Sequence, residues 1–418
     1  MDKLIIKGKQ KLKGSINIHG SKNAALPILV ATLLSNKKIV LSNIPKVDDI
    51  RNMITLLKKY NSKIVENKSN INVNNKNLQN ILADYDIVRK MRASILILGP
   101  LLSRFGYAKI SLPGGCAIGT RPIDIHLDGL SKLGANFNIE NGFVVGKVKS
   151  ILIGNKIKLK FPSVGATQNI LMASVLAKGQ TIIENAAMEP EIKDLGDFLI
   201  SIGAKIKGHG SSKIYIQGVE SLNESNYKII SDRIVAGTYI ILAVMLNSKF
   251  EVKNFNADHI NSLIRVLKKM NANLDIYKNS VKILPSKRLR SVSIATSPYP
   301  GFPTDLQAQI MALMSIVNGT SEIKETVFEN RFMHVPELNR LGAQISLHKD
   351  RAIIEGNQTF RGAQVMASDL RASVSLVLAA LCAEGVTTIN RVYHLDRGYE
   401  KIEKTLKNLG PKIRRQKN

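Results

Sequence analysis

The cysteine at position 116 has surroundings that suit chemistry better than packing. The segment SLPGGCAIGTRPIDIH, residues 111–126, places Cys116 between a glycine pair and a further glycine, with Arg121 shortly after it. The second cysteine, Cys382, lies in the apolar run LVLAALCAEG and is expected to be a buried structural residue. A nearby arginine lowers the pKa of a thiol, so Cys116 is the candidate for a reactive cysteine.

Polar and charged side chains also recur at the predicted starts of six apolar helices. A helix start carries free N–H groups and about half a positive charge, so a cation there opposes the helix dipole unless an anion is bound. The pattern indicates an anion-binding site in which Asp305 would be an acidic residue among basic ones, although each start could be an ordinary solvated one. The residues concerned are Lys22, Asn23, Arg92, Thr167, Gln168, Arg233, Asp305, Asp369 and Arg371.

An internal repeat of about 70 residues positions these side chains. One phrase, a helix that ends in a small-residue turn before an apolar strand, begins at residues 57, 130, 199, 267, 338 and 407. Short β-branched strands and a second, almost wholly apolar helix lie between these phrases, which predicts an α/β fold. The helix near residue 21 is apolar on nearly every face and is therefore expected to be buried, with a more polar helix outside it. Six units predict two domains of three repeats, with buried helices inside and strands around them.

Composition excludes several classes of function. The net charge of +28 invites a nucleic-acid interpretation, but the lysines are scattered, Trp is absent and only 5% of residues are aromatic, so nucleic acid is not an expected partner. Two cysteines without clustered histidines predict neither a disulfide framework nor a metal site and fit a reducing cytoplasm. No apolar run of about 18 residues and no signal peptide are visible, so membrane insertion is not expected.

Several long motifs resemble those of the UDP-N-acetylglucosamine 1-carboxyvinyltransferase family of enolpyruvyl transferases. In chain order these are GSKNAALPIL, LPGGCAIGTRPID, SVGAT, FPTD, ETVFENRFMHVPEL, SDLRAS and DRGYEKIE. The resemblance covers the full length and implies a cytoplasmic enzyme that opens peptidoglycan synthesis. Such an enzyme moves the enolpyruvyl group of phosphoenolpyruvate onto the 3-hydroxyl of the sugar nucleotide and releases phosphate. This chemistry needs no redox cofactor or obligatory metal, and none is expected.

The resemblance also implies a fold and a domain division. It predicts two inside-out α/β domains, one of residues 22–229 that carries the cysteine lid and one of residues 1–21 and 230–418, with the active site in the cleft between them. The family implies that Cys116 donates a proton to the methylene carbon, forms a covalent adduct with phosphoenolpyruvate and is alkylated by fosfomycin. Asp305 is implied to take the proton from the 3-hydroxyl. Lys22, Arg121 and Arg397 are implied to contact phosphoenolpyruvate.

The remaining carried-over residues are expected to bind the nucleotide sugar. Arg121, Pro122 and Ile125 line the uracil, and the backbone and hydroxyl of Ser163, Val164 and Gly165 face the diphosphate at a helix start. Asn23, Arg92 and Val327 are expected to touch the sugar. Further implied substrate-binding positions are Ile123, Asp124, Phe328, Asp369 and Arg371.

Structural alternatives stand beside these roles. Asp305 could stabilise the first turn of its own helix, and Asp369 and Arg371 could form a structural ion pair. His126 is expected to be a solvated or capping side chain, and Arg331 and His334 could simply hold the loop that carries Val327. The rival functions are a shikimate-pathway enolpyruvyl transferase, against which Cys116 argues, and a non-catalytic basic binding protein on the same fold. The oligomeric state is not predicted.

Overall fold

The computed structural model describes residues 2–67, 70–79, 91–112 and 123–417. These residues form two compact units. We call the stretch from residue 20 to 230 the continuous unit, and residues 2–19 together with 231–417 the split unit. The chain passes from one unit to the other after residue 19 and again after residue 230.

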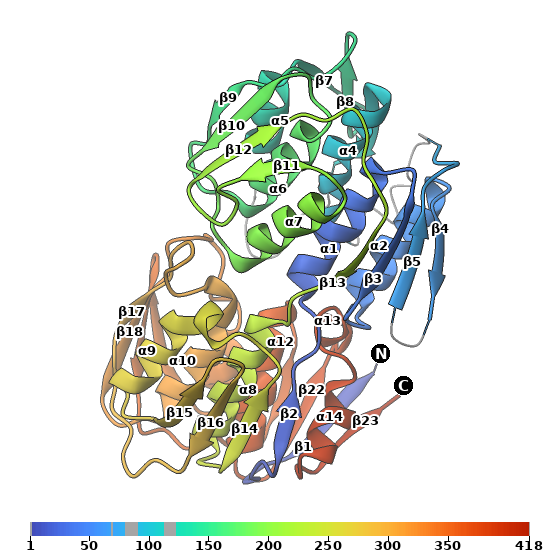
Figure 1. The fold of residues 1–418 in the computed structure, drawn as a ribbon. Coiled ribbons are helices and arrows are strands. Elements are labelled where there is room, and N and C mark those ends of the chain that lie inside the picture. Colours follow the sequence, from blue (N-terminus) through green and yellow to red (C-terminus); the bar gives the residue numbers. More distant parts are fainter. Residues whose placement is uncertain (1, 68–69, 80–90, 113–122, 418) are drawn as a thin grey trace. The chain divides into compact units, whose positions relative to one another are not determined.

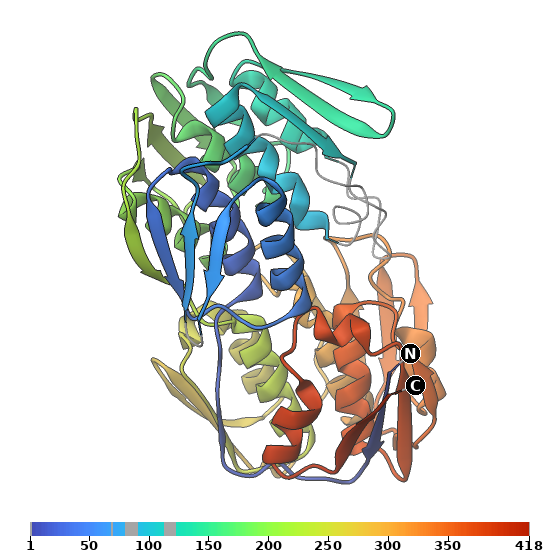
Figure 2. The ribbon, with the colours of Figure 1, turned by 90° about the vertical axis from the view of Figure 1, so that its right-hand side faces the viewer.

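Three helices form the interior of each unit. In the split unit all thirteen residues of α8 (Arg233–Met245) are buried, because its sequence is apolar on every face and can only pack inside. It packs with α10 (Gln307–Ile316) and α12 (Leu370–Cys382), while the sheets lie around these helices (Figures 1 and 2). The matching helices of the continuous unit are α1 (Lys22–Ala31), α4 (Leu98–Phe105) and α6 (Val164–Ser174). The expected buried helices are confirmed.

A second, amphipathic helix follows in every repeat. In α2 (Asp48–Lys59), Ile50, Met53, Ile54 and Leu57 form the buried face and lysines end the exposed face. The others are α5 (Asp124–Lys132), α7 (Pro190–Ser201), α9 (Asn261–Lys269), α11 (Val335–Arg340) and α14 (Ile402–Asn408).

The small-residue turn of the repeat has a conformational cause. One residue just after each amphipathic helix has a positive φ, between 61° and 113°, which glycine and asparagine adopt at least cost. The left-handed residue ends the helix and turns the chain into the next strand. These residues are Asn61, Gly134, Gly203, Asn271, Gly342 and Gly410.

Each repeat contributes one small sheet. The continuous unit has the strand orders β13-β3-β5-β4, β6-β8-β7 and β11-β12-β10-β9. Its strands are β3 (Lys38–Ser42), β4 (Lys63–Glu66), β5 (Asn70–Asn74), β6 (Tyr107–Ser111), β7 (Ala135–Glu140), β8 (Phe143–Val148), β9 (Lys156–Lys158), β10 (Gln180–Glu184), β11 (Lys205–Lys207), β12 (Lys213–Gln217) and β13 (Ser225–Lys228).

The sheets of the split unit have the orders β15-β16-β14-β2, β17-β18-β20-β19 and β21-β22-β1-β23. Among the described residues, five of the six sheets have one parallel edge pair and antiparallel pairs elsewhere. The strands are β1 (Lys3–Lys7), β2 (Ser15–Asn17), β14 (Phe250–Lys253), β15 (Asn273–Tyr277), β16 (Ser280–Leu284), β17 (Ile294–Ala295), β18 (Thr320–Lys324), β19 (Gln344–His348), β20 (Arg351–Glu355), β21 (Gln364–Met366), β22 (Val386–Asn390) and β23 (Ile413–Gln416).

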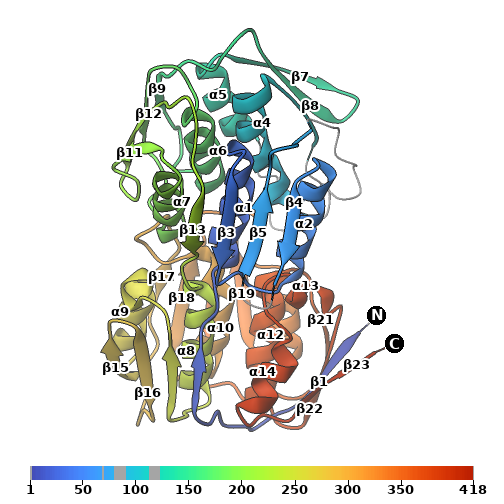
Figure 3. The same ribbon diagram turned by 45° about the vertical axis from the view of Figure 1, so that its right-hand side comes forward.

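The N-terminal segment completes the split unit. Strand β1 pairs antiparallel with both β22 and β23, with Leu4 opposite Ile389 on one side and Arg415 on the other (Figure 3). It occupies the place that β20 holds in the preceding repeat, and Leu4 and Ile6 bury its inner face. Strand β2 adds a parallel edge to β14. The sixth repeat is therefore built from both ends of the chain.

The starts of the buried helices differ in detail from the sequence prediction. The segments before α4 and α10 begin as 3-10 turns, η2 (Arg92–Ile97) and η4 (Thr304–Leu306). Helix α6 begins at Val164, so Thr167 and Gln168 are buried near the end of its first turn rather than exposed at its start. Within the described residues, we find no helix whose length and apolar character would suit a membrane crossing.

Candidate active site

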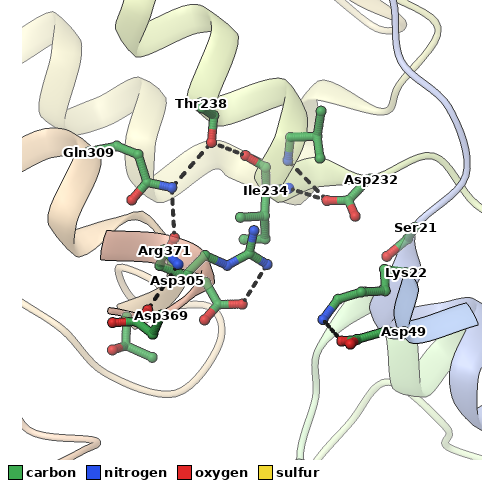
Figure 4. A network of polar contacts seen from close by, with 12 residues as sticks. Ser21, Lys22, Asp49, Asp232, Ile234, Thr238, Asp305, Gln309, Asp369 and Arg371 are labelled. Carbon is green, nitrogen blue, oxygen red and sulfur yellow. Dashed lines mark hydrogen bonds and ion pairs between the residues drawn. The ribbon is translucent and has the colours of Figure 1, made fainter. Parts of the chain in front are cut away.

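Asp305 of the split unit lies between two buried guanidinium groups. Its Oδ1 accepts a hydrogen bond from Nη2 of Arg331 at 2.8 Å, and its Oδ2 accepts one from Nη2 of Arg371 at 2.9 Å (Figure 4 shows the second). The arginine side chains are only 4% and 6% exposed, whereas that of Asp305 is 27% exposed. Two buried cations thus hold the carboxylate of Asp305 in place, while part of the carboxylate remains accessible to solvent.

A buried polar network holds the backbone at Asp305. The backbone carbonyl oxygen of Asp305, in the η4 turn, accepts a hydrogen bond from Nε2 of Gln309 at 3.0 Å. The same Nε2 also donates to Oγ1 of Thr238 at 3.2 Å (Figure 4). The Thr238 hydroxyl lies 2.9 Å from the hydroxyl of Tyr399. Three buried side chains from α8, α10 and the segment after α13 (Tyr393–Asp396) therefore fix the turn.

The expected alternative of an Asp369–Arg371 ion pair is wrong. Asp369 is the N-cap of α12, and its Oδ1 accepts from the backbone N–H groups of Arg371 at 2.9 Å and Ala372 at 3.1 Å. The guanidinium of Arg371 bonds Asp305 instead. Burial lowers the pKa of Arg371, but the charge of Asp305 opposes that effect and the net shift is upward. Arg371 is therefore a permanent cation at a helix start.

The segment before α11 brings Arg331 to the same place. Arg331 is buried, and its guanidinium lies 5.6 Å from the centre of the Phe328 ring while it bonds Asp305. Val327 and Phe328 are partly buried beside it. The sequence suggested only a loop-holding role for Arg331. Because Arg331 contacts Asp305 directly, it is a residue of the site that sequence reasoning missed. His334 is buried 3.2 Å from Sδ of Met311, which fits a packing role.

Arg397 lies at the C-terminal end of the short helix α13 and is partly buried. The preceding residue, Asp396, accepts two hydrogen bonds, at 2.8 and 2.6 Å, from the guanidinium of Arg415 on β23. This bidentate pair fixes the end of α13 from which Arg397 projects.

In the continuous unit, Lys22 begins α1 and its Nζ lies 2.9 Å from Oδ2 of Asp49 (Figure 4). Ser21 caps the helix by accepting from the N–H of Ala24. Asp49 is a buried acid on α2, and sequence reasoning missed it. A signal was present: Asp49 shares the apolar face of its helix with Met53, where an acid without a partner would be costly.

Other predicted residues of this unit lie at element starts. Asn23 follows Lys22 in the first turn of α1, and Arg92 begins η2. Ile123 is the N-cap residue of α5, Asp124 is its first residue and Ile125 its second. Asp124 is exposed, and Ile123 and Ile125 are partly exposed. Ser163 caps α6 by accepting from the N–H of Ala166 at 3.3 Å, which leaves Val164 and Gly165 in the first turn.

The expectation of a solvated or capping His126 is wrong, because the ring is only 7% exposed. Its Nδ1 lies 3.2 Å from Nδ2 of Asn169, which can only donate, so Nδ1 accepts and the ring is neutral. Burial, with a smaller contribution from Arg92, lowers the pKa of His126 to about 4. A Cβ atom at Gly165 would lie 3.0 Å from Cε1 of this ring, so glycine lets the helix start pack on the histidine.

Three predicted site residues, Cys116, Arg121 and Pro122, lie outside the described residues. Cys382, which was expected to be buried, is partly exposed in the last turn of α12 and packs against the apolar core. The surrounding apolar side chains nevertheless raise the pKa of its thiol to about 12 through desolvation, so it remains a poor nucleophile.

A cavity of the continuous unit lies away from these residues. It has a volume of about 690 Å³ and lies at the C-terminal ends of the buried helices, lined by Leu34, Ser103, Arg104 and Leu176 among others. Arg104 caps the carbonyl of Leu33 at 2.8 Å there. The predicted substrate contacts on the buried helices of this unit, Lys22, Asn23 and Ser163 to Gly165, lie at the opposite, N-terminal ends. Among the described residues, no three His, Cys, Asp or Glu side chains come together as a metal site would require.

The fold and the placement of these charges define an enolpyruvyl transferase. Residues 6–406 match the family model described as EPSP synthase (3-phosphoshikimate 1-carboxyvinyltransferase). The solved enolpyruvyl transferase NikO from Streptomyces tendae superposes with a TM-score of 0.90 over 99% of this chain and 98% of that one, at 23% identity. EPSP synthase from Acinetobacter baumannii superposes with a TM-score of 0.77 over both full chains, at 17% identity.

Relatives with higher sequence identity show to which family of enolpyruvyl transferases the chain belongs. The UDP-N-acetylglucosamine 1-carboxyvinyltransferase of Pelagibacter ubique is 54% identical over 99% of this chain and all of its own length. The enzyme of the same description from Lawsonia intracellularis is 51% identical over 99% of both chains. The chain belongs to the UDP-N-acetylglucosamine 1-carboxyvinyltransferase family.

Proposed function

We propose that this chain transfers the enolpyruvyl group of phosphoenolpyruvate to the 3-hydroxyl of UDP-N-acetylglucosamine and releases phosphate. This is the first committed step of peptidoglycan synthesis, and a cytoplasmic location is part of the proposal. The observation that carries it is the identity of 54% over 99% of the chain with an enzyme of that description. The ion-paired Asp305, Arg331 and Arg371 add a chemical reason, because they form an acceptor of protons flanked by cations.

Asp305 is assigned as the acceptor of the hydroxyl proton. Each carboxylate oxygen accepts one guanidinium bond, and the side chain is 27% exposed, so a sugar hydroxyl can approach the carboxylate from solvent. The carboxylate is assigned to take this proton as the hydroxyl oxygen attacks C2 of phosphoenolpyruvate.

Addition across the C=C bond also requires a proton at the methylene carbon, which we assign to the thiol of Cys116. The resulting methyl group then loses a proton as the phosphate leaves, which regenerates the double bond on the sugar. Lys22, Arg121 and Arg397 are assigned to the phosphate and carboxylate of phosphoenolpyruvate. Asp49 supports this role for Lys22, because it holds the Nζ group at 2.9 Å and so reduces the entropy lost on binding.

The sugar nucleotide is assigned to the remaining positions. Ser163 to Gly165 offer backbone N–H groups at the first turn of α6, which suits a diphosphate. Arg121, Pro122, Ile123, Asp124 and Ile125 are assigned to the uracil side, and Asn23, Arg92, Val327 and Phe328 to the sugar. Asp369 and Arg371 complete the substrate-binding set.

One assay tests the proposal. Purified protein is given phosphoenolpyruvate with either UDP-N-acetylglucosamine or shikimate 3-phosphate, and release of inorganic phosphate is followed. We expect release with the sugar nucleotide alone. Release with shikimate 3-phosphate only would assign the chain to the other branch of the fold, and release with neither would favour a non-catalytic protein.

A further inference from the structure

A buried carboxylate outside the predicted site, Glu325, ties together the two segments that carry Asp305 and Val327. It is 5% exposed and follows strand β18. Its Oε2 accepts from the hydroxyl of Thr304 at 2.9 Å, directly before Asp305. Its Oε1 accepts from the N–H of Val327 at 2.9 Å and of Phe328 at 3.3 Å.

The same carboxylate also reaches the neighbouring edge strand. Oε1 accepts from the hydroxyl of Thr296, which follows β17, at 2.8 Å. Four donors therefore converge on one buried anion, and all four are hydroxyl or backbone N–H groups rather than cations. Hydrogen bonds to an ionised acceptor are roughly twice as strong as neutral ones. Glu325 thus provides one common acceptor for three chain segments, two of which are also joined by the pairing of β17 with β18 and by hydrogen bonds between Thr326 and Thr296.

Glu325 and Arg331 both make hydrogen bonds to the η4 turn. Glu325 holds the Thr304 hydroxyl, while Nη2 of Arg331 lies 3.4 Å from the Thr304 carbonyl oxygen and 2.8 Å from Asp305 Oδ1. Both residues belong to the segment 325–331, which also carries Val327 and Phe328. A shift of that segment would therefore move the Asp305 turn with it.

We propose that Glu325 is a positioning residue that locks the sugar-contacting backbone of Val327 and Phe328 in register with the turn that carries Asp305. The proposal rests on the proposed function. According to this proposal, the two carboxylate oxygens of Glu325 affect different kinetic constants. Oε1 positions the backbone that contacts the sugar and so affects the affinity for the sugar nucleotide. Oε2 positions the turn that carries the base, Asp305, and so affects kcat.

The test compares substitutions at three positions, Glu325, Glu322 and Thr304, in the whole chain. Glu325→Gln keeps the size and one acceptor oxygen, but its amide nitrogen must face a threonine hydroxyl, so the charge-assisted bonds are lost. We expect the KM for UDP-N-acetylglucosamine to rise and kcat to fall, each by about tenfold, with the KM for phosphoenolpyruvate within about twofold. Glu322→Gln is the matched control, because Glu322 lies on β18, just before Glu325, in a solvent-accessible pair with Arg351, and this variant should leave all three constants unchanged.

Thr304→Val removes only the hydroxyl bond to Oε2. It should lower kcat and leave the KM for the sugar nucleotide within about twofold, and Thr304→Ser should restore kcat. In the double variant Glu325→Gln/Thr304→Val, kcat should fall by less than the product of the single effects, because both remove the same bond. The proposal is overturned if Glu325→Gln matches Glu322→Gln, or if the two effects on kcat multiply fully. Absence of turnover in the wild-type protein would instead count against the proposed function.

Discussion

Replacement of Asp305 should separate catalysis from stability. Asp305→Ala leaves the guanidinium groups of Arg331 and Arg371, 4% and 6% exposed, without their carboxylate. Breaking one fully buried pair costs about 3–5 kcal/mol. Asp305 itself is 27% exposed, so water reaches the vacated position, and we expect a total loss of about 2–4 kcal/mol.

For a unit of about 200 residues, 1 kcal/mol shifts Tm by about 2–4 °C, so calorimetry should find the split unit melting about 5–15 °C lower. Asp305→Asn keeps one acceptor oxygen and should lose about half of that. Both variants should lose turnover by about 10² to 10⁴ because neither has the base, while sugar-nucleotide binding stays within about tenfold in titration calorimetry. Turnover above about a tenth of wild type in Asp305→Asn would place the base elsewhere, and an unchanged Tm in Asp305→Ala would refute the ion-pair reasoning.

Two further predictions concern pH and covalent inhibition. Burial raises the pKa of the Asp194 carboxyl from 3.8 to about 7. The contribution of Asp194 to folding stability is therefore fully present below about pH 4 and is lost as the pH rises through 7. In urea unfolding, the stability advantage of Asp194→Asn over the wild type should grow from about pH 5 to pH 8, and a constant difference would contradict this. Fosfomycin should inactivate the protein irreversibly, with mass spectrometry placing the adduct on Cys116 and not on Cys382, whose thiol has its pKa raised to about 12. Cys116→Asp should stay active with a lower pH optimum and resist the inhibitor, and inactivation of that variant would remove Cys116 as the target.

Local sequence signals predicted the fold well. The period of the apolar helices and the glycine or asparagine after each amphipathic helix are short-range features, and both were visible in the printed sequence. The helix starts with Lys22 and Arg371 were found for the same reason. These signals say which residues begin an element, but they do not say which side chains meet.

The side-chain partners that sequence reasoning missed lie in distant parts of the chain. His126 looked solvated because its partner Asn169 is 43 residues away, and Arg371 was paired with its sequence neighbour although its true partner Asp305 is 66 residues away. Glu325 carried no signal, since its hydrogen-bond partners lie on three different segments. Tertiary packing decides such pairs, and it overrides the local pattern.

The placement of strand β1 sets the order in which the protein can be completed during translation. The continuous unit is one uninterrupted stretch and can fold once residue 230 has left the ribosome. Strand β1 must wait for β22 and β23, the latter ending at Gln416, before its hydrogen bonds can form. About 410 residues separate β1 from the end of β23, so at about 5–20 residues per second this delay is roughly 20–80 s. During that time the apolar side chains of Leu4 and Ile6 have no sheet to pack into, so the N-terminal strand is a natural target for a chaperone on the ribosome.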